Sequence, residues 1–268
     1  MTQMQTHPPD EAIEGEGPAR AVSLDAVSKV FGHAGDATHA LDRVSLDVAR
    51  GEFVCLIGAS GCGKSTLLNL VAGLDQPTSG TVTVRGKRTS LMFQESALFP
   101  WLTVRGNVEL ALRLDGMPKS QRRGRAYELL EMVHLEDFAD KRPHELSGGM
   151  RQRTALARAL AQESDVLLMD EPFGALDAMT RDLLHDELEA LWTRTGLTVL
   201  FVTHNVREAV RLGNRVVLLT SRPGRIAEEY TVDSGRPRRI DSAQVAELAA
   251  AITDQLRKEV RRHGDPGS

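Results

Sequence analysis

The sequence is poor in aromatic residues and in cysteine, and it has no excess of basic charge. Aromatic side chains are 4% of the 268 residues, and 33 Lys and Arg are outnumbered by 37 Asp and Glu, which gives a net charge of −4. Proteins that bind nucleic acid usually show the opposite balance, so no nucleic-acid partner is expected. Two cysteines do not form a disulfide framework or a Cys/His zinc pattern, and they favour a reducing compartment.

Long apolar runs are also missing. No stretch reaches the roughly 18 consecutive apolar residues of a transmembrane helix. Residues 1–20 are polar, acidic and rich in Pro and Gly, so we expect a disordered tail rather than a signal peptide. The chain is therefore expected to stay in the cytoplasm unless a partner holds it at a membrane.

From residue 22 onward, short apolar runs alternate with helical patterns. Two β-like runs come first, at 22–31 and 43–48. Four later runs are more continuously apolar, as is typical of strands buried on both faces of a parallel sheet. They occupy residues 53–57, 166–169, 198–202 and 216–219. Buried strands that alternate with helices predict an α/β fold with a mainly parallel core sheet.

Helical patterns without strands fill residues 103–161, approximately, and we interpret this stretch as a helical subdomain inserted into the α/β body. A further amphipathic helix is expected over residues 241–262, where apolar residues recur at steps of three or four. The predicted division is a tail over residues 1–20, a body over 21–230 that contains the insertion, and a C-terminal extension over 231–268.

A glycine-rich segment directly follows the apolar run 53–57. It reads Gly58-Ala59-Ser60-Gly61-Cys62-Gly63-Lys64-Ser65-Thr66 and fits the pattern GxxxxGK[ST] between a strand and a helix. Such a loop turns backbone N–H groups toward phosphate oxygens, and the helix behind it points its positive end at the anion. Lys64 adds a charge for the β and γ phosphates, and Ser65 offers a hydroxyl to Mg²⁺.

The positive potential of this loop also predicts a reactive thiol at Cys62, because such surroundings favour the thiolate. Cys55 lies within the apolar run and is expected to be inert.

Two acidic residues, Asp170 and Glu171, close the apolar run 166–169. An Asp at the end of a buried strand can hold Mg²⁺ directly or through water, and a Glu just after it can accept a proton from an attacking water. Together with the glycine-rich loop, this pair predicts hydrolysis of a nucleoside triphosphate.

Four further features resemble those of the ABC (ATP-binding cassette) ATPases. The segment Leu146-Ser147-Gly148-Gly149-Met150-Arg151-Gln152-Arg153 resembles their signature motif, and Phe173-Gly174-Ala175-Leu176-Asp177 resembles their D-loop. Gln94 resembles the glutamine of their Q-loop, and His204 resembles their switch histidine. All four lie in the family's order within residues 22–224, and the combination is far more specific than any one of them.

The resemblance implies a P-loop NTPase fold with an N-terminal antiparallel β subdomain, and it implies ATP and Mg²⁺ as ligands. It also implies that two copies pair head to tail, so that the signature of one copy caps the nucleotide of the other. The residues then expected to contact nucleotide are Phe31, Gly58, Ala59, Ser60, Gly61, Cys62, Gly63, Lys64, Ser65, Thr66, Gln94, Ser147, Gly148, Gly149 and Asp177. Glu171, His204 and Lys64 are the expected catalytic residues, and Ser65, Gln94 and Asp170 are the expected Mg²⁺ residues.

The sequence departs from the family pattern at Met150, Asn205 and Phe31, where Gln, Asp and Tyr are frequent. None of these departures removes a catalytic group, so an active ATPase is expected. Phe31 would stack on the adenine, although a plain core position for this ring stays open.

Residues 95–101, ESALFPW, follow the Q-loop glutamine and carry several large apolar side chains. One interpretation is an apolar groove that accepts a helix from a membrane permease. The other is a buried corner of the helical subdomain.

Finer resemblance, above all in Ser221-Arg222-Pro223-Gly224-Arg225-Ile226, points to the ATPase subunits of nitrate, sulfonate, taurine or bicarbonate importers. It implies a peripheral subunit at the cytoplasmic face of the inner membrane that energises import of a small anionic solute. Its partners would be a second copy of itself, permease subunits and, indirectly, a solute-binding protein. A cassette of an exporter with separate membrane chains and a non-transport regulatory switch are the alternatives.

Overall fold

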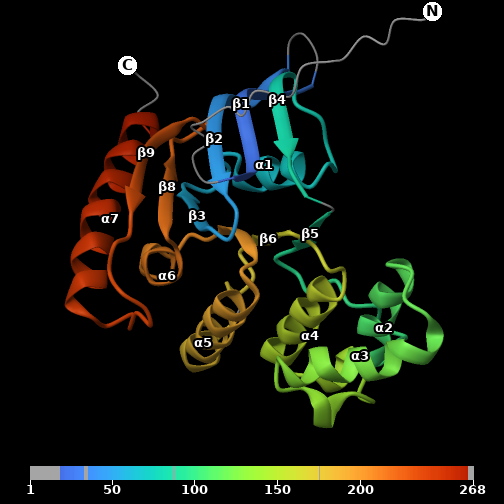
Figure 1. Ribbon diagram of the computed structural model, residues 1–268. Helices are drawn as coiled ribbons and strands as arrows, with labels where there is room; N and C mark the ends of the chain where they lie inside the picture. Colours follow the sequence, from blue (N-terminus) through green and yellow to red (C-terminus); the bar gives the residue numbers. More distant parts are fainter. Residues whose placement is uncertain (1–18, 33–35, 87, 175, 265–268) are drawn as a thin grey trace, which may run out of the picture.

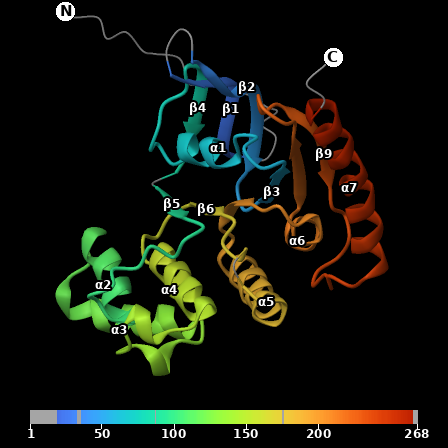
Figure 2. The same ribbon diagram turned by 180° about the vertical axis from the view of Figure 1, so that it is seen from behind.

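The chain folds into an α/β body with a separate helical lobe (Figure 1). The computed structural model describes residues 19–32, 36–86, 88–174 and 176–264. Figures 1 and 2 both show helices α2, α3 and α4 set apart from the sheets, to which they are joined through β5 and β6. All but two residues of the tail expected over 1–20 lie outside the described residues, and the predicted division of the chain into domains stays a prediction.

The body contains two sheets. The larger has the order β5-β6-β7-β3-β8-β9, and all its neighbouring strands pair in parallel except β8 and β9. Its strands are β3 (Phe53–Gly58), β5 (Thr89–Met92), β6 (Val166–Asp170), β7 (Thr198–Val202), β8 (Arg215–Leu219) and β9 (Ile226–Thr231). The smaller, antiparallel sheet has the order β2-β1-β4, with β1 (Arg20–Phe31), β2 (Thr38–Ala49) and β4 (Ser79–Val84).

These sheets confirm the predicted fold class. The sequence analysis had not identified β4, β5 and β9. Strands β4 and β9 are largely exposed, and β5 spans only four residues, so none of the three carries a long apolar run.

Strand β3 is buried on both faces because its side chains alternate between two apolar clusters. Phe53, Cys55 and Ile57 pack into the cluster that also holds residues of the helical lobe. Val54 and Leu56 pack against β1, β2 and α1 instead. A strand covered on both faces needs a continuous apolar run, and each large apolar side chain buried here contributes about 1.5–3 kcal/mol to folding.

The helices of the body are α1 (Lys64–Val71), α5 (Ala178–Thr195), α6 (Val206–Leu212) and α7 (Ala243–Gly264). The lobe contains α2 (Val104–Leu114), α3 (Lys119–Glu131), α4 (Gly148–Leu160) and two 3₁₀ turns, at Glu136–Phe138 and Pro143–Glu145. Within the described parts of the chain, no helix combines the length and apolarity that a bilayer span requires.

Buried Arg238 holds the C-terminal extension against the body. Helix α7 packs along α6, and both figures show it on the flank of the sheet beside β9. The Arg238 side chain is 5% exposed. Its guanidinium donates to the main-chain oxygens of Val210, Arg211, Gly213, Val232 and Ser234.

Replacing Arg238 with Ala is expected to lower the free energy of unfolding by about 2–4 kcal/mol, because buried carbonyl oxygens lose their donor. Urea unfolding followed by circular dichroism measures the change. Arg239→Ala is the matched control, since the Arg239 side chain is 82% exposed and pairs with Asp241 at the surface. The control should change stability by less than about 0.5 kcal/mol, and equal losses in the two variants would contradict this role of Arg238.

Candidate functional site

The glycine-rich loop leaves the carboxyl end of β3 and runs into α1, as the motif predicts. Gly61 and Gly63 have φ values of +75° and +98°, in the left-handed region that favours glycine. A Cβ on Gly63 would lie 2.7 Å from the main-chain oxygen of Ala40. These conformations and the close approach to Ala40 require glycine, and they give a cradle, a loop whose backbone N–H groups can surround the phosphates of a nucleotide.

The Lys64 side chain lies inside this cradle and is 7% exposed. Its Nζ donates to the main-chain oxygens of Gly58 at 2.9 Å and of Ala59 at 3.0 Å. These hydrogen bonds go to neutral carbonyls, so the charge of the ammonium suits an anionic ligand such as a bound phosphate.

Oxygen donors that suit Mg²⁺ stand beside the cradle. The Asp170 carboxyl ends β6 and accepts a hydrogen bond from the Ser65 side chain. Burial raises its pKa, as does the nearby charge of Glu171, while Ser65 and Lys64 act in the opposite direction. No cluster of three or more His, Cys, Asp or Glu that could hold a metal by itself occurs among the described residues. One carboxylate and one hydroxyl next to a phosphate cradle fit Mg²⁺, which binds few protein ligands together with phosphate oxygens.

Gln94 reaches the same edge of the sheet through β5. Met92, the last residue of that strand, pairs with Met169, which directly precedes Asp170. Gln94 is exposed and lies two residues beyond the strand. The fold thus brings Gln94 to the side of the sheet where Ser65 and Asp170 lie.

Glu171 and His204 meet beside this edge. His204 Nδ1 lies 2.9 Å from Glu171 Oε2. The backbone of Glu171 has a φ of +44°, and its N–H donates to the main-chain oxygen of Val202 at 3.0 Å. A non-glycine residue in this conformation costs about 1–3 kcal/mol, which the surrounding structure must compensate. This strained turn aims the carboxylate at the histidine.

A buried polar network behind His204 was not anticipated from the sequence. The Thr203 hydroxyl donates to Glu208 Oε2, and the Thr203 Oγ1 accepts from the main-chain N–H of Asn205 at 3.0 Å. His185 Nε2 lies 2.5 Å from Glu208 Oε1. Arg211 donates to His185 Nδ1, so Nε2 carries the proton and donates to Glu208. Glu208 lies among apolar residues on α6 (Val206–Leu212), and an acidic residue in such a stretch was the one sequence feature that could have indicated a buried polar network.

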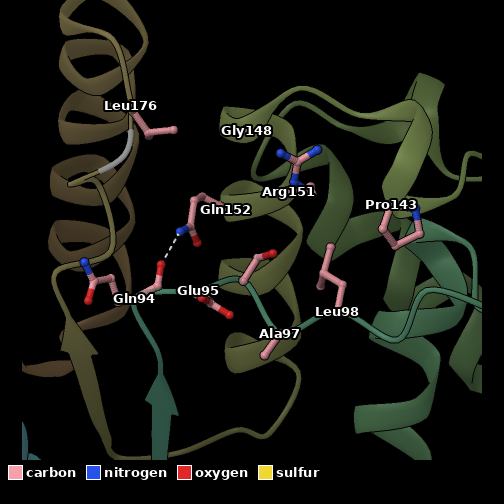
Figure 3. A pocket seen from close by; sticks show the side chains of 10 residues that line it. Gln94, Glu95, Ala97, Leu98, Pro143, Gly148, Arg151, Gln152 and Leu176 are labelled. Carbon is pink, nitrogen blue, oxygen red and sulfur yellow. Dashed lines mark hydrogen bonds between the residues drawn. The ribbon is translucent and has the colours of Figure 1, made fainter.

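The Q-loop is bound by helix α4, which the sequence also did not indicate. Gln152 Nε2 donates to the main-chain oxygen of Gln94 at 2.7 Å (Figure 3). Arg158 donates to the main-chain oxygens of Ser96 and Ala97, at 2.9 and 2.6 Å. Between this loop, α4 and the residue Leu176 lies a cavity of about 410 Å³.

The signature residues belong to the helical lobe and not to the side of the molecule that carries the glycine-rich loop 58–66, the P-loop (Figure 1). Ser147 caps α4 by accepting the Met150 N–H at 3.2 Å. A Cβ on Gly149 would lie 2.5 Å from Cγ2 of Thr180, so this glycine also lets α4 approach α5. Asp177 caps α5 by accepting the Thr180 N–H at 3.0 Å, and that hydrogen bond lowers the pKa of its carboxyl. Ala175, which belongs to the same D-loop, lies outside the described residues.

Phe31 is an exposed ring at the end of β1. It is 43% exposed, and the Lys29 ammonium lies 4.9 Å from its ring centroid. A plain core position is therefore excluded for this side chain.

The structure contradicts the expectation of an activated Cys62 thiol. Cys62 is 1% exposed, and burial raises the pKa of its thiol despite the nearby Lys64. The sequence analysis considered the positive potential but not the desolvation, which is the larger effect. Cys55 is buried, and burial raises its thiol pKa well above the ordinary value, in agreement with the prediction of an inert residue.

A raised thiol pKa reduces the thiolate fraction at neutral pH, so both cysteines should react slowly with Ellman's reagent in the native protein. We expect a rate at pH 7 at least about tenfold below that of the urea-unfolded chain, rising with pH as the thiols ionise. Cys55→Ala and Cys62→Ala variants assign the two rates. Fast reaction of Cys62 at pH 7 would contradict the burial.

Three comparisons with known proteins agree with this geometry. The family described as ABC transporter matches residues 41–174. The nitrate import ATP-binding protein NrtD of Synechocystis sp. is 48% identical over 79% of this chain and 82% of that protein. The taurine import ATP-binding protein TauB of Rhizobium johnstonii is 43% identical over 85% of this chain and 89% of that protein.

Among solved structures, a dimeric post-hydrolysis state of the ATP-binding cassette MJ0796 with bound ADP and Pi is similar to this chain. The TM-score is 0.72 at 36% identity, over 80% of this chain and all of the other. The family match, the large share of the chain that its relatives cover and the phosphate cradle agree. The chain belongs to the ABC transporter family, as an ATP-binding cassette that hydrolyses ATP to drive transport.

Proposed function

We propose that this chain is the ATPase subunit of an importer for a small anionic solute of the nitrate, sulfonate, taurine or bicarbonate type. One observation carries the ATPase chemistry: the cradle with Lys64, the Ser65–Asp170 pair and the Glu171–His204 pair lie along one edge of the parallel sheet. The importer class is supported by the relatives named for nitrate and taurine import. No residue of this site would touch the solute, so the solute class comes from similarity alone.

In this proposal residues 58–66 hold the phosphates of ATP through backbone N–H groups and Lys64. Ser65, Asp170 and Gln94 would hold Mg²⁺, directly or through water. The ion would neutralise charge on the phosphate oxygens. Phe31 would stack on the adenine, which its exposed ring supports.

Glu171 would act as the general base. Its carboxylate accepts a proton from water while the water oxygen attacks the γ-phosphorus and the bond to ADP breaks. His204 would contact the γ-phosphate and orient Glu171, which the 2.9 Å contact between the two side chains supports.

A second copy would complete the site. Ser147, Gly148 and Gly149 form the N-terminal end of the 13-residue helix α4, which favours an anion. Because this end lies in the other lobe, we assign it to the nucleotide of a partner copy, with Asp177 at the seam. The dimeric MJ0796 cassette with ADP and Pi supports this arrangement.

The membrane contact is assigned to the apolar surface beside the Q-loop. Trp101 and Phe99 are 68% and 37% exposed, and their rings lie tilted against each other with centroids 5.5 Å apart. Phe99 also lines a cavity of about 320 Å³ with Phe93 and Leu114, both of which are exposed. This exposure excludes a buried corner and supports a groove for a permease helix at the cytoplasmic face of the membrane, with a solute-binding protein acting through the permease.

The proposal is tested by reconstituting the chain with its permease in liposomes. ATP-dependent uptake of nitrate, taurine or bicarbonate, stimulated by the solute-binding protein, is the expected result. ATP-driven efflux would indicate an exporter, and purification without any membrane partner would indicate a regulatory switch; either result would contradict the proposal.

Glu171→Gln should lower ATP turnover by about 10²- to 10⁴-fold, because the amide cannot accept the proton of water. ATP binding should persist, and the bound nucleotide should hold two copies together. Steady-state phosphate release and sedimentation with Mg-ATP measure the two effects. Turnover near that of the unchanged chain would remove Glu171 from the role of base.

Trp101→Ala should weaken association with the permease by about 30-fold, as loss of a central aromatic contact often does. The ATPase rate and melting temperature of the isolated chain should stay the same, because Trp101 is exposed. Phe138→Ala is the matched control, since this ring is 41% exposed in the helical lobe but, unlike Trp101, is not paired with Phe99. Equal binding by the two variants in a permease pull-down would contradict the docking assignment.

A further inference from the structure

The loop that joins β8 to β9, residues 220–225, lies against the P-loop and has no part in the proposed mechanism. Strand β8 pairs in parallel with β3, and Leu219 at its end pairs with Gly58. Parallel neighbours end at the same edge of a sheet, so the chain that leaves β8 emerges beside the chain that leaves β3 (Figure 1). The latter is the P-loop.

Backbone packs on backbone where the two loops meet. A Cβ on Gly224 would lie 2.1 Å from the main-chain oxygen of Cys62. The Gly224 N–H donates to the main-chain oxygen of Ala40 at 2.9 Å, and its own oxygen accepts from the Asp42 N–H at 3.0 Å. The 220–225 loop is thereby anchored to β2 and pressed on the outer side of the P-loop, with no room for a side chain between them.

Arg222 adds a charged contact to the same side of the P-loop. Its Nε donates to the main-chain oxygen of Gly61 at 3.4 Å, and Nη2 lies 3.4 Å from the position that a Cβ on Gly61 would take. Gly61 is a loop glycine with a φ of +75°. The guanidinium therefore lies beside a segment whose flexible glycine backbone has many alternative conformations.

The contacts of Gly224 and Arg222 are made to carbonyl oxygens of the P-loop, and this determines how the peptide groups of the loop are oriented. In a trans peptide the C=O and the N–H point in opposite directions. The Cys62 oxygen, against which Gly224 packs, belongs to the same peptide as the N–H of Gly63. The contact of Gly224 therefore keeps the Gly63 N–H turned toward the phosphate cradle. The Gly61 oxygen, which Arg222 holds, belongs to the same peptide as the N–H of Cys62, and that N–H donates to the main-chain oxygen of Ala59 at 3.3 Å, so Arg222 fixes the turn that precedes Gly63.

We propose that the 220–225 loop is a brace for the P-loop, and that Arg222 is a positioning residue that increases nucleotide affinity by holding residues 61–63 in their phosphate-binding conformation. The inference rests on the proposed assignment of phosphates to the P-loop. Arg222 acts through the loop backbone and not on the reacting atoms, so it should change KM and nucleotide affinity without changing kcat.

The test compares Arg222→Gln with Arg225→Gln in the full chain. Both changes remove one exposed positive charge from the same loop, but the Arg225 guanidinium binds the Asp42 carboxylate instead of the P-loop. Calorimetric titration with Mg-ADP and steady-state ATPase assays supply Kd, KM and kcat. Hydrogen exchange of the amides of residues 58–66 reports the conformation of the loop.

Arg222→Gln is expected to weaken Mg-ADP binding and to raise KM for ATP by about three- to tenfold, as loss of one charge-assisted hydrogen bond does. Amide exchange in residues 58–66 should become faster, while kcat and the nucleotide-free melting temperature stay unchanged. Arg222→Lys, which keeps a charged donor, should recover part of the affinity, and Arg225→Gln should bind like the unchanged chain.

Three results would overturn the brace. Unchanged Mg-ADP affinity in Arg222→Gln would show that the contact between Arg222 and Gly61 does not contribute to nucleotide binding. An equal loss in Arg225→Gln would mean that general electrostatic attraction, and not the contact with Gly61, is responsible. A loss of kcat together with melting temperature would indicate a merely structural residue. If the unchanged chain bound no Mg-ADP at all, the proposed function itself would fail, and that outcome is distinct from the other three.

Discussion

Parallel pairing places the carboxyl ends of β3, β5, β6, β7 and β8 at one edge of a single sheet, and the phosphate-binding and catalytic groups depend on that alignment. The P-loop follows β3, Asp170 ends β6, and His204 lies just beyond β7. The alignment is maintained because β3 is covered on both faces, by the smaller sheet and α1 on one side and by the large apolar cluster on the other. Burial of apolar surface thus positions the polar groups.

The same packing compensates for local backbone strain at this edge. Glu171 is held in a left-handed turn, and Gly61 and Gly63 adopt conformations that favour glycine. Each is fixed by neighbours distant in the sequence: Val202 accepts the Glu171 N–H, and the 220–225 loop lies against the P-loop. Behind His204, the buried Thr203–Glu208 contact fixes the start of the turn. The catalytic edge thus contains one strained residue, Glu171, beside glycine turns, and packing from distant segments holds them in place.

Helix α4 connects the parts of the site that lie in different lobes. Its N-terminal end carries Ser147, and its side chains Gln152 and Arg158 hold the main chain of the Q-loop at Gln94 and Ala97. The exposed aromatic surface follows this loop directly along the chain. In the proposed function, a permease helix seated there would therefore be linked through one helix to the surface that meets the partner's nucleotide.

Features with a local cause could be predicted from the order of the amino acids. The glycine pattern of the P-loop, the Asp170–Glu171 pair and the continuous apolar runs each follow from neighbouring residues, and they predicted the fold class and the nucleotide chemistry. The environment of those residues depends on how the folded chain packs. The desolvation of Cys62, the exposure of Trp101 and the pairing of His185 with Glu208 result from segments far apart in the chain. The reason is physical: backbone preference and hydrophobic periodicity act over a few residues, whereas burial and buried hydrogen bonds exist only once distant elements have packed together.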